Sequence, residues 1–334
     1  MEKVLVTGAT GFLGKYLTEQ LLSEGYEVLA LGRNKSAGEV LERMEATFCP
    51  GDFTDKEACA PYFKEAEYVI HAGALSTVWG AWDDFYNTNV AGTRTVCELC
   101  LEHGVKRMVY ISSPSIYSGK VHRFDIKEEE YDKDNELNLY IKSKILSEEV
   151  IREFDKKGLD TVTLRPRGLI GIGDTSLIPR ILNANGKIGI PLFHGGENYV
   201  DITCVENVAY AASLGLKAAD VKGEVFNITN GEPTQFKMIL EQFLEAIEEE
   251  PKYLKLPFGL AYGVASLMET IYRVFRKKGE PMLTRYTVCT LAFSQTLDIT
   301  KAKEKLGYTP KITLGEGIKN YGTWWKEHHG SKAV

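Results

Sequence analysis

A glycine-rich turn between a strand and a helix lies at the start of the chain and constrains its fold more than any other feature. Lys3 to Thr7 (KVLVT) is a strand pattern, and it runs directly into Gly8-Ala-Thr-Gly11-Phe-Leu-Gly14 and a helical stretch. Gly8 allows the tight turn, Gly11 lets the backbone approach a pyrophosphate, and Gly14 lets helix and strand pack closely. A pyrophosphate would lie at the helix N-terminus, where free N–H groups favour an anion. The turn therefore predicts a dinucleotide-binding unit, and a glycine-rich turn without a ligand is the alternative.

The first half of the chain alternates short strand patterns with helical stretches. Such alternation is typical of a parallel sheet that helices cover on both faces. The expected strands are Lys3 to Thr7, Glu27 to Leu31, Ala46 to Cys49, Tyr68 to His71, Met108 to Ser112 and Thr161 to Arg165, and the expected helices are Gly14 to Glu24, Lys56 to Phe63, Asn89 to His103 and Leu139 to Lys156.

The second half is less regular and predicts a smaller lobe. Val225 to Thr229 is expected to rejoin the sheet, and Gln235 to Glu249 and Leu260 to Lys277 have helical patterns. We therefore expect an α/β fold, a doubly wound parallel sheet of the Rossmann type with a smaller C-terminal α/β substrate lobe. The expected dinucleotide-binding domain comprises residues 1–174, joined by 200–230, and the substrate lobe comprises residues 175–199 and 231–330.

The end of the second strand predicts which nicotinamide cofactor is used. NAD enzymes usually place an acidic residue there to bind the ribose 2′-hydroxyl. This strand instead ends at Gly32 and is followed by Arg33, Asn34 and Lys35. A guanidinium group favours a 2′-phosphate, so we expect NADP(H). The alternative is NAD, with Arg33 stacked on its adenine.

A carboxylate follows the third strand, in Gly51-Asp52-Phe53. Asp52 stands where it could accept a hydrogen bond from an adenine amino group. The structural alternative, for Asp52 or for Asp55, is to cap the next helix.

Charge and cysteine usage narrow the class of protein. The 334 residues carry a formal net charge of −6, which disfavours a nucleic-acid partner because phosphate binding favours basic surfaces. The N-terminus has no cationic and apolar signal segment, and the six cysteines are scattered, so we expect a cytoplasmic protein. The acidic stretch 125–137 has no helical phase and no histidine, which predicts a solvated loop; no metal site is expected.

The most apolar stretch, 256–275, predicts an amphipathic helix that closes an apolar pocket. Glu269 and Arg273 interrupt it, and Pro257 and Gly259 break its start, so it is a poor membrane span. A peripheral membrane contact through residues 256–278 is the alternative.

A tyrosine and a lysine four residues apart begin the helical pattern at 139–156. The spacing in Tyr140-Ile-Lys-Ser-Lys144 places the phenol and the ammonium group on one helix face. The ordinary pKa of a tyrosine is near 10, too high for a base at neutral pH. A nearby lysine and an oxidised nicotinamide lower it, and in reduction the phenol donates a proton to the developing alkoxide.

With these motifs the chain resembles the extended short-chain dehydrogenase/reductase family over nearly its whole length. The resemblance implies a Rossmann fold and nicotinamide-dependent oxidoreductase or epimerase chemistry. The matching segments, in the family's order and spacing, are TGATGFLG (7–14), GDFTD (51–55), YVIHAGA (68–74), NVAGT (89–93), ISSPSIY (111–117), YIKSKILSE (140–148) and LRPRGLIGIGD (164–174).

The resemblance also implies roles for individual residues. Ser113 would hydrogen-bond the substrate carbonyl oxygen together with Tyr140, with Ser112 and Ser115 as competitors. Asn89 matches the family asparagine that helps to order a water near the lysine, and His71 matches a structural position beside the dinucleotide. The expected cofactor-binding residues are Gly8, Thr10, Gly11, Phe12, Leu13, Gly14, Arg33, Asn34, Asp52, Phe53, Ala72, Gly73, Ala74, Tyr140, Lys144, Pro166 and Gly168.

The substrate subclass is read from the second half of the chain. Sugar-nucleotide epimerases and dehydratases of the family usually carry an arginine that holds the diphosphate, and Val200 takes its place here. The C-terminal third is similar to the 3β-hydroxysteroid dehydrogenase branch and to bacterial reductases of 2-alkyl-3-oxoalkanoates, which implies an apolar substrate. The candidate pocket residues are Trp79, Phe258, Tyr262 and Met268.

The favoured function is therefore hydride transfer between NADP(H) and a secondary alcohol or ketone of a small hydrophobic substrate, with Ser113, Tyr140, Lys144 and Asn89 at the catalytic site. A sugar-nucleotide epimerase that retains NAD is the first alternative. A non-catalytic dinucleotide sensor is the second, because a fold alone never establishes activity. The resemblance implies a homodimer through the helices at 89–103 and 139–156.

Overall fold

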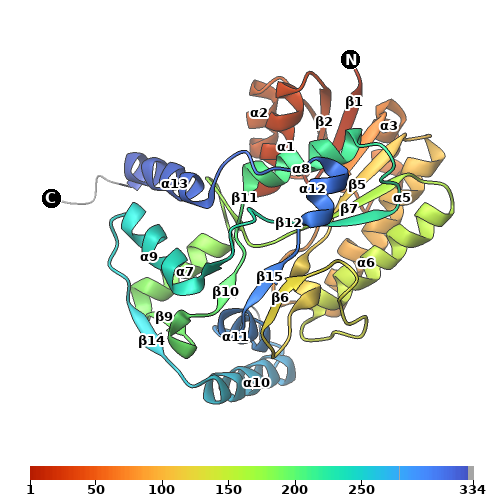
Figure 1. Cartoon of the computed structure of the whole chain (residues 1–334). Helices are drawn as coiled ribbons and strands as arrows, with labels where there is room; N and C mark the ends of the chain where they lie inside the picture. The colour runs from red at the N-terminus through yellow and green to blue at the C-terminus, as the bar shows by residue number, and fades with distance from the viewer. Residues whose placement is uncertain (278, 330–334) are drawn as a thin grey trace.

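The centre of the molecule is a seven-stranded parallel sheet (Figure 1). The structure is a computed structural model that describes residues 1–277 and 279–329. The sheet confirms the expected doubly wound α/β fold. In spatial order its strands are β12 (Glu224–Ile228), β7 (Thr161–Pro166), β5 (Arg107–Ile111), β4 (Tyr68–His71), β1 (Lys3–Thr7), β2 (Glu27–Gly32) and β3 (Thr47–Pro50).

The strands are continuous apolar runs because both faces of the sheet are covered. Val4, Leu5 and Val6 of β1 are all fully buried, as expected for a central parallel strand. One face packs against α1 (Phe12–Ser23) and α8 (Val205–Lys217). The other face packs against α3 (Lys56–Glu65), α5 (Gly92–Glu102) and α6 (Leu139–Lys156).

The direction in which the chain crosses the sheet reverses next to β1. From β1 the chain moves to β2 and β3 on one side, and from β4 it moves to β5, β7 and β12 on the other. In open α/β sheets a crevice forms at such a point, beyond the carboxyl ends of the strands, and ligands bind there. The turns that follow β1, β4 and β5 meet at this edge, and all three carry predicted site residues.

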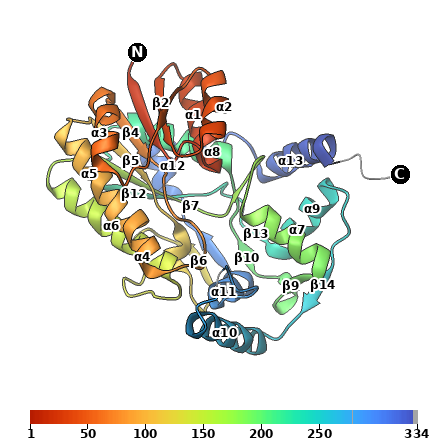
Figure 2. The same cartoon turned by 180° about the vertical axis from the view of Figure 1, so that it is seen from behind.

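The rest of the chain builds a mixed lobe below the carboxyl edge of the sheet (Figures 1 and 2). Its four-stranded sheet has the order β13-β10-β15-β6, and β14 pairs with β9. A further pair, β8 with β11, joins the lobe to the end of β7. The strands are β6 (Arg123–Ile126), β8 (Leu169–Ile170), β9 (Ile190–Leu192), β10 (Tyr199–Val200), β11 (Thr203–Cys204), β13 (Thr234–Gln235), β14 (Tyr253–Lys255) and β15 (Gln295–Leu297), and the helices are α7 (Leu177–Lys187), α9 (Phe236–Ala246), α10 (Phe258–Val274), α11 (Arg285–Ala292) and α13 (Leu314–His329).

Most of the expected elements are confirmed, and the differences arise from tertiary contacts. The helix expected at Asn89 to His103 is observed as α5, which begins at Gly92; Asn89 itself lies in a π-helical segment, Tyr86–Ala91, that follows α4 (Trp82–Phe85). Helix α2 (Lys35–Arg43) was not among the helices expected from the sequence. The first two residues of the acidic stretch 125–137 belong to strand β6, and not to a loop. Around α12 (Thr300–Leu306), residues 299–308 pack into the core beside α1 and α8, although the sequence division assigns them to the substrate lobe.

Candidate functional site

The glycine turn after β1 has the geometry that a pyrophosphate requires. Gly8 adopts a φ of +71°, and a Cβ there would lie 2.7 Å from the Cα of Gly73. Gly11 precedes the first turn of α1, and no side chain caps that helix. Its first N–H groups are therefore available to an anion. The turn fits the phosphates of a dinucleotide.

The turn after β4 lies against the first glycine turn. The Ala72 N–H donates to the carbonyl of Thr7 and the Gly73 N–H donates to its hydroxyl, which fixes this turn, with Ala74, beside β1. Phe53 fills the space behind Gly73, and a Cβ on Gly73 would lie 2.5 Å from the ring. The structure thus places Phe53 as packing behind this turn.

Arg33 and Asp52 form an ion pair at the carboxyl ends of β2 and β3. The guanidinium group lies 3.1 Å from Asp52 Oδ2, and 77% of the Arg33 side chain is exposed. The other oxygen of Asp52 accepts from the backbone and side chain of Thr54. Asn34, a predicted cofactor residue, caps α2 by accepting from the Ala37 N–H. An exposed pair of this kind contributes little to stability, so Arg33 is free to reach a phosphate.

His71, at the end of β4, is buried and neutral. Its Nδ1 lies 2.6 Å from the Thr7 hydroxyl and its Nε2 lies 3.0 Å from the Thr93 hydroxyl. Burial, and to a smaller extent the charge of Lys144, lowers the pKa of His71 to about 3. The ring ties β1, β4 and α5 together, which agrees with a structural role.

The serines that follow β5 have separate tasks. The Ser112 hydroxyl donates to Glu148 Oε1 at 2.6 Å inside the core. The Ser113 hydroxyl donates to Ser115 Oγ at 3.0 Å and accepts from the Ser115 N–H. It also lies within hydrogen-bonding reach of the Tyr140 phenol. Of the three candidates, Ser113 is therefore the one beside the tyrosine.

Tyr140 stands at the start of α6, half-buried, with its ring against Phe85. Burial raises the pKa of its phenol to about 12, the hydrogen bond with Ser113 lowers it, and the nearby Tyr286 raises it. A phenol with this pKa carries its proton at neutral pH. It is therefore suited to donate the proton to a developing alkoxide.

Lys144 lies one helical turn after Tyr140 and is held by β5. Its Nζ donates to the Tyr110 phenol oxygen and to the carbonyl of Ile111, each at 2.9 Å. Burial lowers the pKa of Lys144 to about 7, while Glu148 acts in the opposite direction. The sequence motifs did not indicate Tyr110 as a hydrogen-bond partner of Lys144. Only the pairing of β5 with α6 brings it to the lysine.

Asn89 fastens the loop between β4 and α4 to helix α6. Its side chain accepts from the Leu75 N–H at 2.7 Å and donates to the Leu75 carbonyl and to the Ser143 hydroxyl. The Asn89 carbonyl also accepts from the Ser147 hydroxyl. Asn89 lies in the π-helical segment and contacts Ser143, the neighbour of Lys144 in α6, so it positions the loop that borders the site.

A buried ion pair joins β7 to α6 next to the turn that follows β5. Arg165 donates to both oxygens of Glu148, at 2.8 and 2.6 Å, and both side chains are at most 2% exposed. The same glutamate accepts from Ser112. The pair therefore connects β7, α6 and the turn that carries Ser113. Pro166 ends β7, and Gly168 follows with a φ of +48°.

The predicted substrate residues lie where loop and lobe meet. Trp79 contacts Tyr272 and Arg273 of α10. Tyr262 and Phe258 belong to a cluster with Phe193 and Phe293 in the lobe. Trp79 thus joins the dinucleotide edge to α10, while the two α10 aromatics pack mainly within the lobe. Met268 is half-buried on the same helix.

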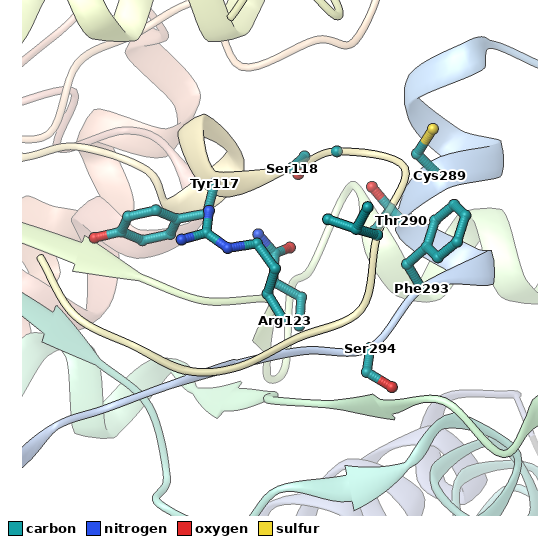
Figure 3. A pocket seen from close by; sticks show the side chains of 10 residues that line it. Tyr117, Ser118, Arg123, Cys289, Thr290, Phe293 and Ser294 are labelled. Carbon is teal, nitrogen blue, oxygen red and sulfur yellow. The ribbon is translucent and has the colours of Figure 1, made fainter. Parts of the chain in front are cut away.

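A small cavity lies between the catalytic segment and α11 (Figure 3). It extends from Tyr117 and Ser118 to Thr290 and Phe293. Its volume of about 10 Å³ holds no more than one water molecule. This cavity is too small for an organic substrate.

The fold and the arrangement of the site are those of a nicotinamide dinucleotide-binding α/β protein. A family model described as the NAD dependent epimerase/dehydratase family matches residues 4–229. The chain belongs to this family, that of the extended short-chain dehydrogenases/reductases, and it is an NAD(P)-dependent dehydrogenase or reductase.

Three relatives match almost the whole chain. An uncharacterized protein of Escherichia coli, YbjS, is 37% identical and covers 98% of each chain. A 2-alkyl-3-oxoalkanoate reductase of Stenotrophomonas maltophilia is 32% identical and covers 95% of this chain and 97% of its own. A decarboxylating sterol-4-alpha-carboxylate 3-dehydrogenase of Mus musculus is 31% identical and covers 95% and 89%. These relatives confirm the predicted branch of the family.

A solved structure of a UDP-glucose 4-epimerase from Thermotoga maritima has the same fold. It is 25% identical, superposes with a TM-score of 0.76, and covers 98% of this chain and 99% of its own. Fold similarity therefore extends to the sugar-nucleotide enzymes as well.

Proposed function

We propose that this protein transfers hydride between NADP(H) and a secondary alcohol or ketone of a hydrophobic substrate, either a 3-oxo acid or a 3β-hydroxysteroid-like molecule. The observation that carries the proposal is the pairing of Ser113 with a protonated Tyr140, one turn before the buried Lys144. The names of the relatives, a reductase of 2-alkyl-3-oxoalkanoates and a sterol dehydrogenase, support the substrate class.

In this proposal each side chain has one task. The bound nicotinamide supplies or accepts the hydride. Ser113 donates a hydrogen bond to the substrate oxygen, and Tyr140 gives its proton to that oxygen during reduction and takes it back during oxidation. Lys144 stabilises the phenolate. It would bind the cofactor ribose in exchange for its hydrogen bond to the Tyr110 phenol oxygen. Asn89 fixes the loop that borders these groups.

The preference for NADP(H) over NAD(H) is part of the proposal. Arg33 projects from the end of β2 with its side chain largely exposed, and its partner is Asp52. A 2′-phosphate offers this guanidinium group a doubly charged acceptor in place of one carboxylate oxygen.

The chief alternative is a sugar-nucleotide epimerase, which the shared fold would allow. Such an enzyme needs a cation for the diphosphate, and Val200 occupies that position in β10. Val200 is only 5% exposed and pairs with Gln295. The second alternative is a dinucleotide sensor, and loss of turnover in Tyr140→Phe separates it from an enzyme.

We propose that the protein is a cytoplasmic homodimer. Its six cysteines are all free and buried, as is usual in a reducing compartment. Helices α5 and α6 lie side by side and would form the dimer contact that the family resemblance implies. We also propose that residues 1–174 with 200–230 bind the dinucleotide and that residues 175–199 with 231–330 bind the substrate, except that residues 299–308 pack into the core of the dinucleotide-binding part.

A surface contact through α10 also belongs to the proposal. Within residues 1–277 and 279–329, no helix is long and apolar enough to cross a membrane. Helix α10 nevertheless exposes Leu260, Val264 and Leu267 at helical spacing, and Arg276 and Lys277 follow its end. A helix of this kind lies on an anionic lipid surface, from which a hydrophobic substrate could be taken up.

The first experiment measures consumption of NADPH and of NADH against 3-oxo acids, 3-ketosteroids and aromatic ketones. We expect turnover with NADPH preferred, at least 100-fold lower turnover in Tyr140→Phe, and a loss of the NADPH preference in Arg33→Ala. Interconversion of sugar nucleotides without added cofactor, together with no ketone turnover, would contradict the proposal.

A further inference from the structure

Arg167 is a mostly buried arginine whose guanidinium group has no hydrogen-bond or ion-pair partner among residues 1–277 and 279–329. Only 6% of the residue is exposed. Arg165, two residues earlier, is also buried, but its guanidinium group donates hydrogen bonds to both carboxylate oxygens of Glu148. No nitrogen of Arg167 is among the fully enclosed side-chain atoms without a hydrogen-bond partner, so its donors keep some access from outside and an anionic ligand can reach them.

The position of Arg167 places it beside the catalytic serine. Strands β5 and β7 are neighbours, with Ile111 opposite Leu164, and the Ser112 N–H donates to the Leu164 carbonyl at 2.7 Å. Ser113 and Pro166 each lie two residues further along. Since paired strands lie about 4.8 Å apart, the chain leaves β7 at Arg167 close to Ser113.

Tyr286 of α11 connects Arg167 to the catalytic tyrosine. Its phenol is near enough to influence the pKa of both the Tyr140 phenol and the Arg167 guanidinium group. Tyr286 also packs on the cluster that contains Ile116 and Ile141, the neighbours of the catalytic segment. Arg167 and Tyr140 are therefore both within electrostatic reach of Tyr286.

Asp201 is the acidic group that influences Arg167, and it forms no ion pair with the guanidinium group. Its Oδ2 accepts from the Leu297 N–H at 2.7 Å. Burial raises the pKa of Asp201 to about 6, and at pH 7 the group is still mostly a carboxylate, so Asp201 balances part of the charge of Arg167 without a direct contact. The N–H groups of the Arg167 guanidinium group are therefore available to hydrogen-bond a ligand.

We propose that Arg167 binds the carboxylate of the substrate, and that this substrate is a 3-hydroxy or 3-oxo acid with its carboxylate two carbons from the reacting carbon. The inference rests on the proposed function and selects the acid from the substrates considered there. A guanidinium group matches a carboxylate with two parallel hydrogen bonds. Anchored in this way, the acid presents its oxygen at C3 to Ser113 and Tyr140, and its alkyl chains extend toward the apolar lobe.

The chemistry is balanced in either direction. On oxidation the C3–H bond breaks and its hydride passes to the oxidised nicotinamide, while the O–H proton passes to Tyr140. The product is the 3-oxo acid. Reduction reverses both transfers.

The experiment compares a 2-alkyl-3-hydroxyalkanoic acid with its methyl ester, as substrates for oxidation with NADP⁺. We expect the acid to have a kcat/KM about 100-fold higher than the ester in the native protein, through a lower KM. In Arg167→Gln this ratio should fall to within about threefold. Arg180→Gln, which removes an exposed arginine of α7, is the matched control and should keep the native ratio.

A binding measurement makes the test independent of turnover. A 2-alkylalkanoic acid without the hydroxyl group is titrated by calorimetry into the protein with NADP⁺ present. We expect binding that Arg167→Gln weakens about 30-fold and Arg167→Lys weakens less. Thermal unfolding checks that each variant is folded.

The outcomes separate the two proposals. Equal turnover of acid and ester by the native protein, abolished in Tyr140→Phe, would keep the proposed function and overturn the role of Arg167. Absence of turnover with either compound would contradict the proposed function, and the calorimetric result would then decide on the carboxylate site. A larger loss of NADP⁺ affinity than of acid affinity in Arg167→Gln would assign this arginine to the cofactor and overturn the inference.

Discussion

At the scale of single residues, burial decides the charge of the groups in the site. Lys144 is 2% exposed and its pKa is lowered to about 7, whereas its ordinary value is 10.5. The unfolded chain therefore binds more protons than the folded one between pH 7 and 10.5. In this range the buried lysine lowers the free energy of unfolding, and its cost decreases as the pH rises.

Replacement of this lysine tests the argument. We expect Lys144→Met to abolish turnover and yet to raise the melting temperature at pH 7, because no charge is then buried. The gain should shrink between pH 7 and pH 10, because Lys144 of the folded protein is then neutral and removing the proton from the lysine of the unfolded chain costs less as the pH rises. Calorimetric melting at several pH values measures this, and a gain that grows with pH would contradict the assigned pKa.

A second residue-scale prediction concerns the ion pair below the site. Glu148→Gln leaves Arg165 buried without its counter-charge, so we expect the free energy of unfolding to fall by about 3–5 kcal/mol. Glu153→Gln on the same helix is the control. Its pair with Arg94 is about 40% exposed on both sides, so its loss should cost much less than the loss of the buried pair. Urea unfolding of both variants provides the measurement, and equal losses would refute the difference.

At the scale of elements, the close approach of the turns after β1 and β4 shapes the dinucleotide site. Gly8→Ala places a Cβ 2.7 Å from the backbone of Gly73, in addition to the strain of its positive φ. Gly104 has nearly the same φ, +68°, with open space around it. Gly104→Ala should therefore cost only the backbone strain, about 1–2 kcal/mol.

We expect Gly8→Ala to cost clearly more than Gly104→Ala and to weaken NADP⁺ binding at least tenfold, because the turn must open. Gly104→Ala should leave the affinity for NADP⁺ at the native value. Chemical unfolding and fluorescence titration measure the two quantities. The same loss of stability in both variants would mean that the contact with Gly73 is not tight.

At the scale of the whole molecule, α10 lies at the end opposite the N-terminus (Figure 1), and its side chains Leu260, Val264 and Leu267 are exposed. We expect the protein to sediment with vesicles that contain phosphatidylglycerol and to do so less with neutral vesicles. The double variant Leu260→Ser and Leu267→Ser should lose most of this binding. Met238→Ser, which changes an exposed residue of α9, should retain it. If the double variant binds as the native protein does, α10 is not the contact.

Several features of this protein followed from the sequence by itself. The glycine turn, the apolar runs of β1, β4 and β7, and the helical pattern of the 18-residue α6 are local patterns, and each was confirmed. They are local because the spacing of apolar residues that favours a strand or a helix is a property of neighbouring residues along the chain. The order of the family motifs then led to the family itself.

Only the tertiary structure decided the surroundings of these residues. No pattern in the sequence pairs Tyr110 with Lys144, Glu148 with Arg165, or Ser112 with Glu148, because each pair joins separate elements. For the same reason residues 299–308 pack into the first core, and Arg167, at the end of β7, is only 6% exposed. Local patterns determine which elements form, whereas charge, burial and hydrogen bonding depend on which elements meet.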